Sequence, residues 1–445
     1  MKRIRISGVG CCLMDRIYDH VDFQSKTFYE YLSKTGGDGG MEPGKLTFEE
    51  ELERFAGQSF ASDILPRLTE GRVPDKENIG GPCVVALINA SQLAYKESVV
   101  SFYGCRGDDE VGQTLLQKLG QTNLDLSHYR IQPESETPST SVLSDPHFDN
   151  GHGERTFVNT IGASWHYLPE ELDDSFYESD ICVFGGTALV PRIHQGLSLM
   201  LRRAKQRGCI TVVNTVYDFL SEKNDPAHCW PLGDSDECYR FTDLLIVDRE
   251  EALRLSGCSD IDSAIAFFRE KGTGAVIVTN GAQNVSLWAD SPLFGKVPEQ
   301  TMPVSAAVGE ALKQGRKGDS TGCGDNFAGG VIGYLAKSLS QQQHQHLPLS
   351  LSSSPQSSPE SSLKASPIIS PKASSASSPK GKDFPPLSEE TGAGFEGNGI
   401  LLEACRWGIV SGGFSCFYYG GTYLEKHEGE KLSLLQNLYD QYIVQ

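Results

Sequence analysis

Short, nearly continuous apolar runs alternate along this chain with segments in which apolar residues recur at helical spacing. The strand-like runs lie at residues 4–9, 99–102, 181–184, 210–214, 244–247 and 275–279. The helical periods lie at residues 84–94, 112–119, 192–206, 250–255 and 261–270. Apolar strands without polar alternation are typical of strands that are buried on both faces. The pattern therefore predicts a doubly wound α/β fold, with a mostly parallel sheet and helices on both of its faces.

Two regions interrupt this alternation. Residues 19–76 are polar and rich in glycine, and residues 139–144 and 155–161 are strand-like on either side of the turn-forming sequence DPHFDNGHGE. Such a pair of strands around a polar turn is typical of a hairpin. We expect these regions, near 16–78 and 139–161, to build a small β-sheet lid over one end of the main sheet.

The composition changes sharply at residues 338–380, which hold sixteen serines, six prolines and no aromatic residue. Such a segment cannot bury enough apolar surface to offset the entropy lost on ordering. Apolar helical patterns at 327–335 and 400–417 flank it. We therefore expect one core domain, formed by 1–337 and 391–445, that is interrupted by a disordered insert at 338–390.

The charge balance excludes several classes of partner. Lysine and arginine number 39 and aspartate and glutamate 58, which gives a formal net charge of −19. This excess of acidic groups repels nucleic acids and anionic membranes, so neither is an expected partner. Twelve cysteines without a CxxC pair, and an N-terminal apolar run that Asp15 interrupts, predict a reduced cytoplasmic protein without a signal peptide or membrane span.

Candidate chemistry is concentrated at residues 318–330, GDSTGCGDNFAGG, which directly precede an apolar helical run. A helix that begins in glycines presents unpaired N–H groups, which together with the helix dipole attract an anion. Asp325 lies beside that position. An aspartate repels a bound phosphate, but it is well placed to accept the proton of an alcohol that attacks the phosphate. The alternative interpretation is that Asp325 only caps the helix.

The sequence GDSTGCGD resembles the C-terminal signature of the ribokinase (PfkB) family of carbohydrate and nucleoside kinases, whose common form is D-T-x-G-A-G-D. It departs from that form at Ser320 and Cys323, both of which are small. The resemblance implies that Asp325 is the general base. It also implies that the amides of Gly322, Cys323 and Gly324 form an anion hole. Asp319 and Thr321 would contact the nucleotide.

Other segments match the family in order along the chain. ISGVGCCLMD supplies Asp15 for substrate binding, and NIGGPCVVALINA supplies the paired glycines Gly80 and Gly81. The run VDREEALRLSG resembles the N-x-x-E element that holds magnesium, with Asp248 in place of asparagine and Glu251 as the glutamate. Carboxylates suit Mg²⁺, although an N-cap and a solvated helix face would explain the same residues. Gly420 and Gly421 resemble the nucleotide-base loop.

Other positions qualify the match. The family usually carries an asparagine that binds the sugar four residues after the second glycine, where this chain has Val85. Asn78 and Asn89 are candidate substitutes for that hydrogen bond, although ordinary polar roles explain both. Arg106 and Arg155 are candidate contacts for an anionic substrate group, against the simpler interpretation of surface residues.

We expect an ATP-dependent kinase that phosphorylates a hydroxyl of a small sugar, with Mg²⁺ as cofactor and a monovalent cation as an optional addition. Two alternatives stay open: a nucleoside kinase that acts on a molecule such as adenosine, and a non-catalytic protein that kept the fold for binding or regulation. The resemblance also allows a homodimer. A Rossmann dehydrogenase is excluded because Leu13 occupies its third glycine position, and no P-loop sequence is present.

Overall fold

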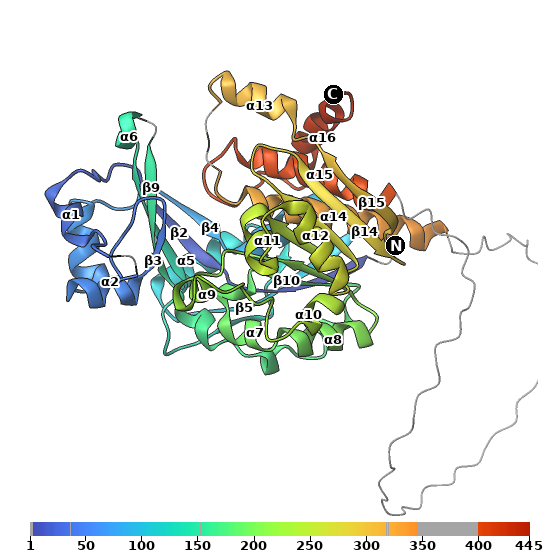
Figure 1. Cartoon of the computed structure of the whole chain (residues 1–445), viewed down its shortest axis with the longest axis horizontal. Coiled ribbons are helices and arrows are strands. Elements are labelled where there is room, and N and C mark those ends of the chain that lie inside the picture. Colours follow the sequence, from blue (N-terminus) through green and yellow to red (C-terminus); the bar gives the residue numbers. More distant parts are fainter. Residues whose placement is uncertain (1–2, 36, 152, 317, 319, 346–398) are drawn as a thin grey trace, which may run out of the picture.

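The computed structural model describes residues 3–35, 37–151, 153–316, 318, 320–345 and 399–445, and its core is built around one large sheet (Figure 1). The strand order is β15-β14-β13-β12-β11-β10-β1-β5-β6, and β7 pairs with β5. The bounds are β1 Ile4–Val9, β5 Ser98–Arg106, β6 Leu124–Asp125, β7 Tyr129–Ile131, β10 Ile181–Gly185, β11 Ile210–Asn214, β12 Leu244–Asp248, β13 Ala275–Thr279, β14 Val285–Ser291 and β15 Gly295–Met302. Every pairing from β13 to β6 is parallel, which confirms the predicted doubly wound sheet.

The two strands β14 and β15 were not predicted. They pair antiparallel to β13 and to each other at one edge of the sheet. β15 exposes four of its eight residues, and half of its sequence GKVPEQTM is polar. An edge strand with one solvated face has little apolar signal, which is why it escaped the sequence pattern.

Helices cover both faces of the sheet, as predicted. One face packs against α4 (Pro82–Leu93), α5 (Glu110–Leu119), α14 (Cys323–Gln345), α15 (Ile400–Ser415) and α16 (Glu430–Tyr442). The other packs against α7 (Pro191–Gln195), α8 (Leu197–Gln206), α10 (Glu237–Arg240), α11 (Arg249–Ser256) and α12 (Ile261–Glu270). The helix predicted at 192–206 is thus divided at Gly196. Two further helices are α9 (Phe219–Asn224) and α13 (Ala306–Lys313).

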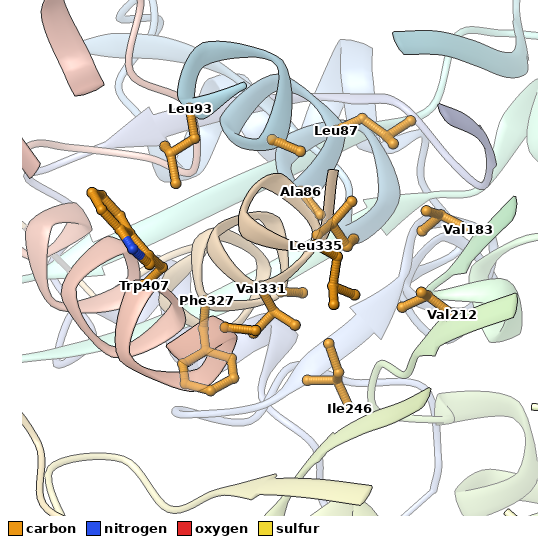
Figure 2. Close-up of a cluster of buried hydrophobic side chains, with 14 of the residues drawn as sticks. Ala86, Leu87, Leu93, Val183, Val212, Ile246, Phe327, Val331, Leu335 and Trp407 are labelled. Atoms are coloured by element: carbon orange, nitrogen blue, oxygen red, sulfur yellow. The ribbon is translucent and has the colours of Figure 1, made fainter. Parts of the chain in front are cut away.

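Helix α14 lies at the centre of the first face. Figure 2 shows its residues Phe327, Val331 and Leu335 between α4, α15 and the sheet strands. All three side chains are at most 4% exposed. Because protein interiors are close-packed, a helix surrounded in this way has little freedom to shift. The residues at its N-terminal end are therefore held by the core.

A separate small sheet forms the lid, as predicted. Its strand order is β3-β9-β8-β2-β4, with bounds β2 Leu13–Tyr18, β3 Leu46–Phe48, β4 Lys76–Gly80, β8 Ser139–Asp145 and β9 Glu154–Thr160. The lid lies to the left of the core in Figure 1. The hairpin β8–β9 encloses the short helix α6 (Phe148–Gly151).

The lid is not purely β, because residues 19–75 carry helices that the sequence analysis did not predict. These are α1 (Lys26–Tyr31), α2 (Glu49–Ala56), the π-helix Phe60–Ile64 and α3 (Leu65–Leu68). Phe28, Tyr31 and Leu52 from these helices form a hydrophobic cluster with Leu143 and Val158 from the sheet. The lid thus has a small core of its own. Short 3-10 helices elsewhere are Gly162–His166, Pro169–Glu171, Phe176–Glu178 and Thr187–Leu189.

The start of the predicted insert needs a correction. Helix α14 continues to Gln345, so residues 338–345 are helical rather than part of a disordered segment. Ser338 and Ser340 are buried, which explains why a polar sequence continues the helix. The rest of the predicted insert, up to residue 390, lies outside the described residues. Within the described ranges, no helix is both long and apolar enough to cross a membrane.

Candidate active site

The predicted site residues gather where the parallel strands end, on the side that faces the lid. Asp15 follows β1, Asp248 ends β12, and Asp325 lies in the first turn of α14. In open α/β sheets, ligands bind at the carboxyl ends of the strands, and the strand ends here follow that rule. The fold thus brings together residues that are more than 300 positions apart in sequence.

Asp325 is half-buried, and its carboxylate has no hydrogen-bond partner among the described residues. Burial raises the pKa of Asp325 to about 6. Burial also raises the pKa of the Cys11 and Cys83 thiols and of the Glu251 carboxyl, and the negative charge of Asp325 adds to each increase. A carboxylate with a pKa near 6 that makes no structural hydrogen bond has the properties of a general base.

The backbone before Asp325 forms only part of the expected anion hole. The amides of Gly322 and Gly324 have no acceptor among the described residues, whereas the Cys323 amide donates to the Ser320 carbonyl at 3.3 Å. That bond is long for an N–H···O contact and leaves the amide weakly held. Gly322 has φ +73°, and a Cβ there would lie 2.6 Å from the Gly421 Cα. Only glycine therefore fits this turn.

Asp15 and the paired glycines lie together. Asp15 is 7% exposed, and a Cβ on Gly80 would lie 2.3 Å from its Oδ2 atom. The absence of a side chain at Gly80 is what lets the carboxylate approach the backbone of β4. Gly81 then begins α4 as its N-cap residue, with φ +109°.

Asp248 and Glu251 form a capping box at the start of α11. The Asp248 carboxylate accepts from the Glu251 amide at 2.8 Å, and Glu251 Oε2 accepts from the Asp248 amide at 2.9 Å. The Thr215 hydroxyl donates to the same Oε2 at 2.5 Å. Burial and then repulsion from Asp248 raise the pKa of Glu251 to about 8. The expected N-cap is therefore confirmed, whereas the expected solvated helix face is wrong for Glu251, which is buried.

In the described part of the chain, no cationic side chain balances the negative charge of these carboxylates, so the site can accept a metal cation. Among the described residues, none of Asp248, Glu251 and Asp325 forms an ion pair, and no three metal-ligating side chains enclose a metal ion by themselves. Glu251 lines a cavity of about 20 Å³, which is enough for one water molecule. Mg²⁺ is commonly held by one or two carboxylates, water and substrate phosphates, so this donor set fits it.

The turn at Gly420 and Gly421 packs against the start of α4 and against residues 320–324, the proposed catalytic turn before Asp325. Gly421 faces Val85, whose Cγ2 would be 3.1 Å from an added Cβ. Asn78 donates to the carbonyls of Tyr419 and Thr422 at 2.7 and 3.1 Å, so it holds this turn. The position of the missing family asparagine is therefore an apolar contact, and Asn78 does not replace it.

The lid contributes Arg155, one of the two arginines expected either to contact an anionic substrate group or to be a surface residue. Arg155 on β9 is half-buried, and its Nη1 donates to the Thr321 hydroxyl at 3.4 Å, directly before the catalytic turn. Arg106 is 6% exposed and donates to the Gly107 carbonyl, so it has a structural role. Asp319 lies outside the described residues.

Two residues that position the site were not predicted. Asn326, next to Asp325, donates from Nδ2 to the carbonyls of Gly322 and Gly421 at 2.9 and 2.7 Å. Lys431 on α16 is 1% exposed, and its Nζ donates to Asn326 Oδ1 at 2.8 Å. Burial lowers the pKa of Lys431 to about 7. This lysine fixes the orientation of the amide that joins the two glycine turns.

Asn89 completes this network. Its Nδ2 donates to the Asn326 carbonyl at 2.6 Å from the buried face of α4. It therefore holds the first turn of α14. Of the two expected roles of Asn89, the ordinary structural one agrees with this contact. No sequence signal marked Lys431, because a lysine beside glutamates on a helix normally indicates a solvated face.

Comparison with known proteins agrees with this geometry. Residues 76–348 match the model of the pfkB family carbohydrate kinases. The chain is 24% identical over 280 residues to the aminoimidazole riboside kinase of Salmonella typhimurium, covering 60% of this chain and 77% of that one. It is 24% identical over 269 residues to the ribokinase of Haemophilus influenzae, covering 59% and 75%.

Solved structures share the fold. The adenosine kinase from Schistosoma mansoni in complex with 2-fluoroadenosine has a TM-score of 0.61 and 14% identity, covering 94% of this chain and 96% of that one. A probable sugar kinase from Rhizobium etli has a TM-score of 0.60 and 15% identity, covering 98% and 100%. At these identities the likeness establishes the ribokinase-like fold alone.

Proposed function

Because the chain belongs to the pfkB family of carbohydrate kinases, we propose that it transfers the γ-phosphate of ATP to a hydroxyl of a small sugar. The observation that carries the proposal is Asp325, a carboxylate without a structural hydrogen bond beside two unoccupied backbone amides. A half-buried carboxylate without a structural hydrogen bond is costly to keep, and a non-catalytic protein would have no need of it at this position.

The chain's own groups divide the reaction between them. Asp15 and the backbone at Gly80 orient the acceptor, and Asp325 accepts the proton of its attacking hydroxyl. The amides of Gly322 and Gly324, with the weakly held Cys323 amide, stabilise charge that develops on the transferred phosphoryl group. These donors are fixed before substrate binds, which is the condition under which such stabilisation is most effective.

The lid supplies one more positive group. The Arg155 guanidinium lies against Thr321 and can contact a phosphate bound at the turn, so that closing the lid delivers its charge to the site. A closed lid also excludes water, which would otherwise compete with the sugar as acceptor.

Asp248 and Glu251 would hold Mg²⁺, in part through water. When bound, the ion would neutralise charge on the phosphates. Among the chain's own groups, Glu251 has a raised pKa, and a cation nearby would restore its ionised form. The twelve cysteines without a CxxC pair favour a cytoplasmic location for this kinase.

One observation favours a nucleoside as the second candidate acceptor. Val85 is 1% exposed and packs against Gly421, where the family asparagine would bind a sugar hydroxyl. An apolar wall at this position suits an acceptor that carries a planar base. The polar Asp15 side chain, which both acceptor classes can use, does not discriminate between them.

The test is ADP formation with ATP, Mg²⁺ and a panel of sugars and nucleosides. We expect turnover that depends on one acceptor class, and a loss of about 10²- to 10⁴-fold in kcat for Asp325→Asn, the range for a general base. Asp108→Asn makes the same chemical change at an exposed aspartate and controls for it. No acceptor-dependent turnover, or equal turnover by Asp325→Asn, would favour the non-catalytic alternative.

A further inference from the structure

Two cysteines meet at the catalytic turn. Cys323 is the first residue of α14, and Cys416 is the C-cap residue of α15. Their Sγ atoms lie 3.4 Å apart, and both side chains are partly exposed. We propose that this pair is a reversible thiol-oxidation site, at which a peroxide joins Cys323 to Cys416 and thereby disables the anion hole.

The surroundings of Cys323 favour a reactive thiol. Cys323 lies in the first turn of a 23-residue helix, where the helix dipole favours a thiolate. The Ser415 hydroxyl has one proton, which it can donate either to Cys323 Sγ at 3.1 Å or to the Gly412 carbonyl at 2.7 Å. A hydroxyl that can turn toward the sulfur stabilises a negative charge there.

The other cysteines in the described residues are mostly unlike this pair. Burial raises the pKa of six of these thiols, which keeps them protonated and inert: Cys11, Cys12, Cys83, Cys105, Cys238 and Cys405. Cys229 is exposed. It therefore serves as an internal measure of whether an oxidant has reached the protein.

The chemistry balances with hydrogen peroxide as oxidant. The Cys323 thiolate attacks one peroxide oxygen and breaks the O–O bond, which gives a sulfenic acid and, after protonation of the leaving hydroxide, water. The Cys416 sulfur then attacks the Cys323 sulfur, and a second water leaves as the S–S bond forms. Two thiols lose two electrons and two protons, and one peroxide becomes two waters.

The new bond would move the anion hole. A disulfide needs its sulfurs about 2.05 Å apart, so the pair must approach by more than 1 Å in total. Residue 323 supplies one amide of the hole and is bonded to Gly322, which is already in tight contact with Gly421. Displacement of catalytic groups by about 1 Å can cost about 10²-fold in rate, so we expect at least a tenfold loss of kcat.

The effect on activity rests on the proposed function, whereas the disulfide itself does not. Trypsin would release Cys323 in a peptide of residues 318–337 and Cys416 in a peptide of residues 407–426, each with a single cysteine. The full chain is reduced, desalted and treated with hydrogen peroxide. It is then digested without reductant, and the linked peptide is measured by mass, two hydrogens below the sum of its parts.

The expected result is that the linked peptide and the loss of phosphotransfer rise together and that dithiothreitol reverses both. Cys416→Ser should keep its activity through the treatment, and Cys229→Ser should stay sensitive. Cys323→Ala is read by peptide mass alone and should form no link. If the reduced chain phosphorylates no acceptor, the proposed function fails while the linked peptide still decides the oxidation site.

Two results would overturn the inference. One is oxidation of Cys229 without a 318–337 to 407–426 link, because the oxidant then reached the chain and the pair did not react. The other is a full yield of the link with unchanged turnover, because the bond then leaves the anion hole intact.

Discussion

The two halves of the active site are held in different ways. The catalytic turn and the start of α14 are tied to the core by Asn326, Asn89 and Lys431, all of which are at most 1% exposed. The lid has its own hydrophobic cluster and meets the rest of the site at its edges, through Arg155 on Thr321, Phe48 on Phe219 and Asn78 on the carbonyls of Tyr419 and Thr422. The difference indicates that the half proposed to bind phosphate is preorganised, whereas the half proposed to bind the acceptor can move as a unit.

The largest effect should come from a substitution in the preorganised turn before α14. Gly322→Ala forces an unfavourable φ of +73° and places a Cβ 2.6 Å from the Gly421 Cα, so the two turns must separate. We expect kcat to fall about 10²-fold with a smaller change in KM, as for a misplaced catalytic group. Steady-state kinetics check this. Gly309→Ala, where an added Cβ meets nothing within 4 Å, is the matched control. Near-normal kcat in Gly322→Ala would mean that the turn is not preorganised.

Removing the lid's charged contact should have the next largest effect. Arg155→Ala deletes a group that can contact phosphate only when the lid is closed. A hydrogen bond to a charged group is worth about 1.5 to 3 kcal/mol, so kcat/KM should fall by about 10- to 100-fold. Arg130→Ala, at an exposed arginine, provides the comparison. The same kcat/KM in both variants would show that Arg155 stays outside the reaction.

The pH profile should report the state of Asp325. Its pKa is raised to about 6, and the base must be ionised to accept a proton. The value of kcat/KM should therefore fall about tenfold per pH unit below pH 6, and Asp325→Asn should lose this dependence. The pH dependence of folding stability has the opposite sign. Because the folded pKa lies above the unfolded value, this group's contribution to stability is lost as pH rises from about 4 to 6.

The smallest effect should come from loosening the lid. The rings of Phe48 and Phe219 meet edge to face at 6.2 Å, and Glu51 on α2 forms an ion pair with Lys223 on α9. An aromatic pair contributes about 0.5 to 1.5 kcal/mol, so Phe48→Ala should raise KM by about 2- to 12-fold and leave kcat nearly unchanged. Phe267→Ala removes a similar edge-to-face pair with Tyr239, on the other face of the core, and serves as the control. A large fall in kcat would show instead that the lid helps to position the catalytic turn.

The sequence predicted the core well because its signals are local. Strands β1, β11 and β13 and helix α12 have the predicted bounds, since buried apolar runs and amphipathic periods are read within a few residues. The pfkB kinase family and the ribokinase-like fold are confirmed. The lid helices escaped because their apolar residues face a small separate cluster and are spaced among glycines and charges.

The assignment of roles in the site was less complete, because those roles depend on contacts over long distances in the sequence. The motif identified Asp325 and its turn, and the structure brings Asp15, Gly80 and Glu251 to the same strand ends. Their chemical roles stay predictions. Lys431 could not be identified, because only the fold shows that its amine points into the protein rather than into water.

The position of Lys431 also affects when activity can begin. A ribosome adds the Asp325 carboxylate more than a hundred residues before it adds the lysine that orients the neighbouring amide. A nascent chain that already contains every group of the proposed chemistry therefore still lacks the support that aligns them. Phosphate transfer should thus begin only after α16 has been synthesised and has docked, which keeps incomplete chains from consuming nucleotide.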